Sequence, residues 1–148
     1  MMPLYKKILV PTDGSKNAQS AAVLGLEMAK MMNAEVTVIS IVDVKATVSL
    51  QQGLGVPDQY AYQQGAADAA AEAVMKVAGD MTVKATAVVK RGSPAFDIIE
   101  ASKDHDLVIM ATKGLTGVKH FLMGSVAEKV VRFAECPVLV IKTLEHED

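Results

Sequence analysis

The sequence predicts one α/β domain over residues 1–148, built on a doubly wound parallel sheet with helices on both faces. Two periodicities lead to this prediction, because short runs rich in valine and isoleucine alternate with longer stretches of helical spacing. Such alternation is typical of parallel strands joined by right-handed crossover helices. The length agrees, since 148 residues suit a single hydrophobic core.

The strands are expected to be almost continuously apolar, as in sheets buried on both faces. Their number fits a flavodoxin-like or adenine-nucleotide α-hydrolase-like sheet. The pattern does not give the strand order, and we adopt 3-2-1-4-5 as the working order. The predicted strands are Lys7–Val10, Glu35–Val42, Val83–Val89, Asp106–Ala111 and Val138–Ile141.

The first two helices follow from apolar spacing. Small and apolar residues between Ala18 and Met32 recur at steps of three and four, which places them on one stripe. Ser15 is the expected N-cap of this helix, and Asn33 its left-handed end. An alanine-rich helix is predicted from about Asp58 to Ala78, ending at Gly79.

Two further helices are predicted from their start signals. Ser93 as N-cap with Pro94 at the first helical position begins the third. The run Ser125-Val126-Ala127-Glu128 is a capping-box pattern and begins the fourth. The segment Val44–Pro57 has no clear periodicity and is interpreted as an irregular loop, either functional and mobile without ligand or a solvated excursion without a role.

Composition excludes several classes of protein. A net charge of −2 gives no basic excess to attract nucleic acid or anionic lipid. Cys136 is the only cysteine, so no intrachain disulfide is possible. No apolar run approaches the roughly 20 residues that span a bilayer. We therefore expect a soluble, cytoplasmic protein that binds neither nucleic acid nor membrane.

A ligand is expected at the carboxyl ends of the strands, where the strand order reverses. Pro11–Ser15 follows the first predicted strand, and Ala111–Gly117 follows the fourth and runs on to Met123–Ser125. In the working order these strands are neighbours, so both segments are predicted to line one crevice.

The second segment has the features of an anion site. Gly114 and Gly117 allow main-chain N–H groups to approach a ligand, and Gly124-Ser125 begins a helix whose N-terminus favours phosphate. The alternative is that the glycines only make turns and Ser125 only caps its helix. Positive charge is available from Lys113, Lys119 and His120.

Asp13 is expected at the mouth of the same crevice. Its carboxylate is suited to accept hydrogen bonds from ribose hydroxyls, although a helix-start residue stabilised by the helix dipole is an alternative. The main chain of Ile41, at the end of the second strand, is placed to flank an adenine ring.

With these residues in view, the chain resembles the universal stress protein family over nearly its whole length. The matching pieces are Tyr5–Ser15, Gly124–Val130 and Cys136–Val140. The ATP-binding branch of that family carries a glycine, two residues, a glycine, nine residues, and then glycine with serine or threonine. Gly114, Gly124 and Ser125 fit this pattern, whereas the first glycine falls on Ala111.

The resemblance implies ATP binding, with Mg²⁺ or Mn²⁺ bridging the phosphates. It implies that Pro11, Thr12 and Asp13 contact adenine and ribose. It also implies a homodimer formed through the edge strand Val138–Ile141. The remaining residues implied are Ile41 at the adenine, Met110 and Ala111 near the ribose, Thr112 and Lys113 beside them, and Gly114, Gly124, Ser125 and Val126 at the phosphates.

Three functions remain open: a nucleotide sensor acting on an unknown protein partner, a slow ATPase or phosphotransferase, and a scaffold without nucleotide. The chain lacks the G-x-x-x-x-G-K-[ST] loop of efficient phosphoryl transfer, and we assign no catalytic residue. His120 is the one available base, and a lone loop histidine is more often only solvated. A phospho-acceptor receiver is excluded because Lys90-Arg91-Gly92 stands where its acceptor aspartate would follow the third strand.

Overall fold

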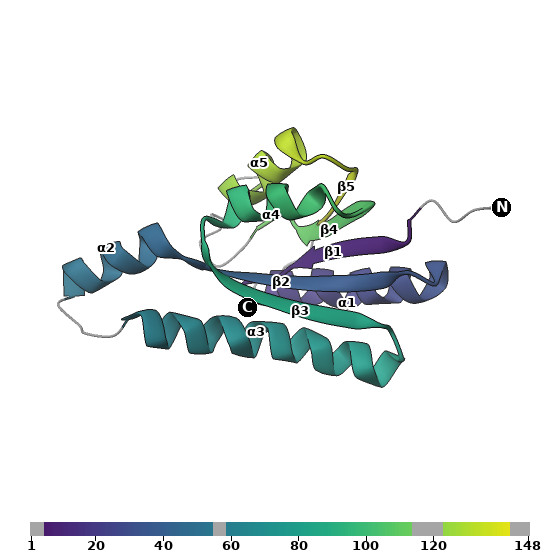
Figure 1. Cartoon of the computed structure of the whole chain (residues 1–148), viewed down its shortest axis with the longest axis horizontal. Coiled ribbons are helices and arrows are strands. Elements are labelled where there is room, and N and C mark those ends of the chain that lie inside the picture. Colours follow the sequence, from purple (N-terminus) through teal and green to yellow (C-terminus); the bar gives the residue numbers. More distant parts are fainter. Residues whose placement is uncertain (1–4, 55–58, 114–122, 143–148) are drawn as a thin grey trace.

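The computed structural model describes residues 5–54, 59–113 and 123–142. Within these ranges strands alternate with helices as predicted, except that two helices instead of one lie between the second and third strands (Figure 1). The elements in chain order are β1 (Lys7–Pro11), α1 (Lys16–Met32), β2 (Glu35–Asp43), α2 (Val44–Leu54), α3 (Gln59–Met81), β3 (Ala85–Gly92), α4 (Pro94–Ser102), β4 (Leu107–Ala111), α5 (Ser125–Phe133) and β5 (Val138–Ile141).

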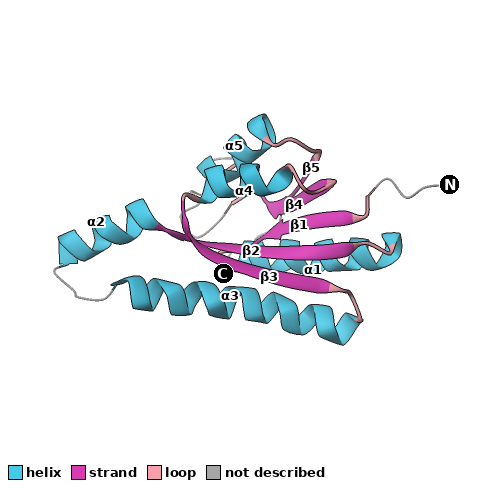
Figure 2. Ribbon diagram, viewed as in Figure 1, coloured by secondary structure: helices cyan, strands magenta, loops and turns pink. Residues whose placement is uncertain are grey.

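The sheet has five strands in the order β3-β2-β1-β4-β5, all parallel, so the predicted fold and strand order are confirmed. Helices α1 and α3 cover one face, and α4 and α5 cover the other (Figure 2). Each face has its own apolar core. Ile8, Val10 and Ile109 belong to the core under α1 and α3, whereas Leu9 and Val108 belong to the other.

Both ends of α1 follow the sequence prediction. The Ser15 hydroxyl accepts a hydrogen bond from the Ala18 N–H at 3.1 Å, which is the N-cap bond. Asn33 ends the helix in the left-handed region, with φ of 55°. Both cap predictions are confirmed, because each cap depends only on residues a few positions apart in the chain.

The interpretation of Val44–Pro57 as an irregular loop is wrong, because Val44–Leu54 forms α2. Asp43 caps this helix, since its Oδ1 accepts a hydrogen bond from the Ala46 N–H at 3.1 Å. The buried Thr47 hydroxyl donates to the Asp43 carbonyl oxygen at 2.7 Å. Strand β2 therefore continues directly into a capped helix.

The boundaries between α3 and β3 also differ from prediction. Helix α3 passes through Gly79 and ends at Met81, and Thr82 follows in the left-handed region with φ of 60°. The Lys30 ammonium group donates to the Met81 carbonyl oxygen at 2.8 Å, which stabilises the longer helix end. Strand β3 then runs over Ala85–Gly92 instead of Val83–Val89, because its pairing with β2 continues to that strand's end.

The starts of α4 and α5 show that a cap position and a cap hydrogen bond are separate things. Ser93 is the N-cap of α4, as predicted, but its side chain makes no cap hydrogen bond. Helix α5 has Gly124 as N-cap, which places Ser125 inside the helix and makes the predicted capping box wrong. Glu128 instead pairs with Arg132, at 2.9 Å between carboxylate and guanidinium.

None of the helices in the described ranges combines the length and hydropathy needed to cross a membrane.

Candidate functional site

The candidate site lies at the carboxyl ends of β1 and β4, which are neighbours at the point where the strand order reverses. The Thr12 N–H donates to the Ile39 carbonyl oxygen at 2.9 Å and so fixes the exit of β1 against β2. The Gly124 N–H donates to the Thr112 carbonyl oxygen at 2.6 Å, which joins the start of α5 to the end of β4. The described parts of the two predicted segments therefore lie at the same, carboxyl end of two neighbouring strands.

The turn after β1 is held by its own side chains. The buried Thr12 hydroxyl accepts a hydrogen bond from the Gly14 N–H at 3.2 Å, and Asp13 Oδ1 accepts one from the Ser15 N–H at 3.0 Å. Gly14 has φ of 82°, a conformation that disfavours other residues. Asp13 is exposed at the surface of this turn.

Three of the predicted nucleotide-binding residues, Pro11, Ile41 and Met110, lie on one face of the sheet. Met110 is buried in the core under α4 and α5, and Ile41 packs against that core from β2. Side chains alternate along a strand, so Pro11 lies on the same face as Leu9 two residues before it. The Pro11 and Met110 side chains are buried, so they belong to the packed core beneath the strand ends.

Ala111 lies on the opposite face from Met110. It follows Ile109 by two residues, and Ile109 belongs to the core under α1 and α3. Ala111 is only 7% exposed. The methyl group that replaces the motif glycine therefore points away from the face that holds Pro11, Ile41 and Met110.

The start of α5 offers main-chain N–H groups without a side-chain cap. Gly124, the N-cap, has no side chain and so makes no side-chain cap hydrogen bond. Ser125 occupies the first helical position and is exposed, while Val126 is half-buried behind it. A helix N-terminus of this kind favours a negatively charged group.

The rest of the predicted site is only partly placed. Thr112 and Lys113 are half-buried at the end of β4. The remaining predicted residues of this loop, Gly114, Gly117, Lys119 and His120, lie outside the described residues. Within those described residues, no group of three His, Cys, Asp or Glu side chains is arranged to hold a metal ion.

Sequence reasoning missed an ion pair between Lys90 and Asp97, which lies next to Ile41. Lys90 is the register partner of Ile41 on β3, and its ammonium group lies 3.1 Å from the Asp97 carboxylate. Asp97 also accepts a hydrogen bond from the Ser93 N–H at 2.8 Å. The signal available in the sequence was an acidic residue, Asp97, four residues after the predicted N-cap Ser93.

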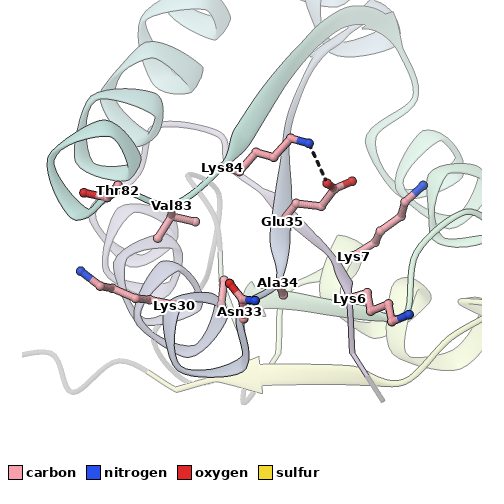
Figure 3. Close-up of a pocket in the computed structure, with 10 residues that line it drawn as sticks. Lys6, Lys7, Lys30, Asn33, Ala34, Glu35, Thr82, Val83 and Lys84 are labelled. Carbon is pink, nitrogen blue, oxygen red and sulfur yellow. Dashed lines mark ion pairs between the residues drawn. The ribbon is translucent and has the colours of Figure 1, made fainter. Parts of the chain in front are cut away.

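A separate hollow of about 550 Å³ lies at the opposite, amino end of the strands (Figure 3). Lys6, Lys7, Lys30 and Lys84 are among its lining residues. Figure 3 shows that these side chains do not converge, and Lys84 pairs with Glu35 at 3.4 Å. The C-terminal ends of α1 and α3 lie beside this hollow and disfavour an anion, and Lys30 donates a hydrogen bond to the Met81 carbonyl oxygen at the end of α3.

The structure is an open, doubly wound α/β sheet, and the candidate site lies where its strand order reverses. A family model described as the universal stress protein family matches residues 4–142, and the chain belongs to that family.

Relatives agree with this assignment over almost their whole length. Universal stress protein MJ0531 of Methanocaldococcus jannaschii is 39% identical over 148 residues, which cover 97% of this chain and 86% of the relative. The structure of universal stress protein UspA from Lactobacillus plantarum is 27% identical, with a TM-score of 0.75 and coverage of 93% and 97%. A universal stress protein from Archaeoglobus fulgidus in complex with dAMP shares the fold, at 19% identity, a TM-score of 0.67 and coverage of 94% and 99%.

Proposed function

We propose that this chain is a dimeric, ATP-binding regulatory protein of the cytoplasm that catalyses little or no chemistry. The observation that supports the proposal is that two segments follow neighbouring strands at the point where the strand order reverses. The turn that bears Asp13 follows β1, and the uncapped N-terminus of α5 is bonded to Thr112 at the end of β4. Together they offer a carboxylate to a ribose and main-chain N–H groups to phosphates.

Each part of the nucleotide has a matching surface. The base lies against Pro11, Thr12 and the main chain of Ile41, and the ribose lies near Met110 and Ala111. The ribose hydroxyls donate to the Asp13 carboxylate. The phosphates accept hydrogen bonds from the α5 N-terminus and the Ser125 hydroxyl, with Gly114, Lys113 and Val126 completing the site. A divalent cation such as Mg²⁺ or Mn²⁺ would be held mainly by phosphate oxygens of the nucleotide and would neutralise part of their charge.

Ala111 is compatible with this arrangement. Its methyl group is on the face of Ile109, away from Met110 and the base. The relative solved with dAMP binds an adenine nucleotide, which supports an adenine nucleotide as the ligand of this chain.

The dimer is proposed to form through β5. Its four residues are half-buried and carry no charge, whereas the other edge strand, β3, carries Lys90 and Arg91. Charged side chains protect an edge from pairing, and an apolar edge invites it. The carbonyl groups of Pro137 and Ile141 bond to β4, so the main-chain groups of Val138 and Val140 face the open edge.

The nucleotide proposal is tested by what the purified protein carries and binds. Freshly purified protein is denatured, and the supernatant is analysed for adenine nucleotides. The nucleotide-free protein is then titrated with ATP and Mg²⁺ in a calorimeter. Released nucleotide or a saturable heat supports the proposal. Absence of both at millimolar ATP overturns it in favour of the scaffold.

The other two parts of the proposal have their own measurements. Phosphate release from ATP is expected to stay near the uncatalysed background, and multiple rapid turnovers would identify an ATPase instead. Val140→Pro removes one N–H from the open edge and leaves the β4 pairing intact. It is expected to convert a dimer to a monomer in analytical ultracentrifugation, and an unchanged dimer would place the interface elsewhere.

A further inference from the structure

The turn that bears Asp13 packs directly against α3. A Cβ atom built on Gly14 would lie 3.3 Å from the Ala70 Cβ and 4.0 Å from the Ala70 Cα. That spacing is tighter than an ordinary van der Waals contact. Ala70 is only 5% exposed, so a larger side chain at this position has little free space around it.

Any shift of Gly14 is passed on to Asp13, because hydrogen bonds join the residues of this turn. The Gly14 N–H donates to the Thr12 hydroxyl, and the next N–H, that of Ser15, donates to Asp13 Oδ1. The Ser15 hydroxyl in turn accepts from Ala18 at the start of α1. The position of the carboxylate therefore depends on where the Gly14 main chain rests.

Helix α3 is held firmly on both sides of Ala70. Towards its C-terminal end, Val74 and Ala78 are buried in the core under α1 and α3. Towards its N-terminal end, the Arg91 guanidinium carbon lies 4.7 Å from the centre of the Tyr60 ring. Added atoms at residue 70 are therefore expected to move the short turn and not the long helix.

We propose that Ala70 is a positioning residue for the nucleotide site, whose small size sets the place of the Asp13 carboxylate against the ribose. The proposal rests on the proposed function, in which Asp13 binds the ribose hydroxyls. It assigns to α3 a role in ligand selection, although α3 contributes none of the predicted nucleotide contacts.

The test is the ratio of two dissociation constants, those for 2′,3′-dideoxy-ATP and for ATP. The first ligand lacks the hydroxyls that Asp13 binds but keeps the base and phosphates. The wild type is expected to prefer ATP by about ten- to a hundredfold, the effect of losing a hydrogen bond to a charged group. In Ala70→Val this ratio is expected to fall to about one to twofold, because the displaced carboxylate no longer reaches the ribose.

Two control variants separate positioning from general loss of stability. Ala78→Val makes the same substitution in a buried position of α3, about 12 Å further along the helix. Ala70→Gly destabilises the helix but adds no atoms next to Gly14. Both are expected to keep the wild-type ratio. A wild-type ratio in Ala70→Val, or an equal loss in Ala78→Val, overturns the proposal.

A second readout needs no ligand. The Gly14 and Ser15 N–H groups are the donors within the turn, and their hydrogen exchange is expected to be at least about tenfold faster in Ala70→Val than in the wild type or Ala78→Val. If the wild type bound no nucleotide, the proposed function would fail and the ribose role of Ala70 with it. If the wild type bound ATP while exchange in Ala70→Val stayed unchanged, positioning by Ala70 alone would be refuted.

Discussion

The carboxylate of Asp97 occupies the space beside Gly92 that any larger side chain would need. Asp97 Oδ2 accepts a hydrogen bond from the Ser93 N–H at 2.8 Å, and Oδ1 lies 3.1 Å from the Lys90 ammonium group. Because Gly92 has no side chain, the Asp97 carboxylate can bind both Ser93, the N-cap residue of α4, and Lys90 on β3.

Gly92→Ala is expected to destabilise the protein by about 1–3 kcal/mol, because the added methyl group displaces the Asp97 carboxylate from its partners. The same substitution made in an Asp97→Ala background is expected to be nearly neutral. Urea unfolding of the two single variants and the double variant gives the coupling energy. Equal costs in both backgrounds would show that the carboxylate is not the obstacle.

Ser125→Ala is expected to weaken ATP binding about ten- to a hundredfold, through the loss of a hydrogen bond to a charged phosphate. Because Gly124 is the N-cap, the free energy of unfolding should change by less than about 0.5 kcal/mol. Ser15→Ala removes a real cap bond and should cost about 1 kcal/mol. Calorimetric titration and urea unfolding check the two effects, and unchanged ATP affinity would remove Ser125 from the site.

Asp43→Ala is expected to loosen α2 by about 1 kcal/mol, because it removes the carboxylate that accepts from the Ala46 N–H. Hydrogen exchange should become faster over Val44–Leu54 and stay unchanged in α1 and α5. Lys45→Ala, on the same helix without a cap bond, serves as the control. Uniformly faster exchange across the protein would mean that α2 does not open as a separate unit.

The Asp106 carboxylate contributes stability that depends on pH. The main-chain N–H groups of Lys7 and Lys6 each donate to Asp106 Oδ2 at 2.9 Å and lower the pKa of this carboxyl below its usual value. The contribution is therefore complete above the unfolded pKa of about 3.9 and is lost as the pH falls through the lower folded pKa.

Asp106→Asn is expected to be less stable than the wild type at neutral pH and to approach it in acid. The difference between their urea midpoints should narrow as the pH falls below about 4. Asp104→Asn, a neighbour that makes neither of these bonds, should follow the wild type. A constant difference from pH 7 to pH 2 would contradict the assignment.

Predictions from the sequence are most accurate where the structure depends on residues close together in the chain. Ser15 and Asn33 mark the ends of α1 through bonds to residues in the adjacent turns, and the structure has both. The capping box at Ser125 is wrong for the opposite reason. Its pattern is local, but Gly124 is bonded to Thr112 from β4 and takes the cap position. Asp43 was a local signal for the missed helix over Val44–Leu54, because it is the N-cap of that helix. The apolar residues of this segment show no clear helical periodicity, and the helix was therefore not predicted.

The sequence by itself determined the kind of every element except α2, the order of these elements along the chain, and the residue types at the two reversals, because alternating apolar runs and short-range caps depend on neighbouring residues. Only the tertiary structure decided that Gly14 rests on Ala70, that Lys90 is aligned with Ile41, and that Ala111 faces away from Met110. These relationships depend on strand order, register and close packing between residues far apart in the chain, and no local pattern encodes them.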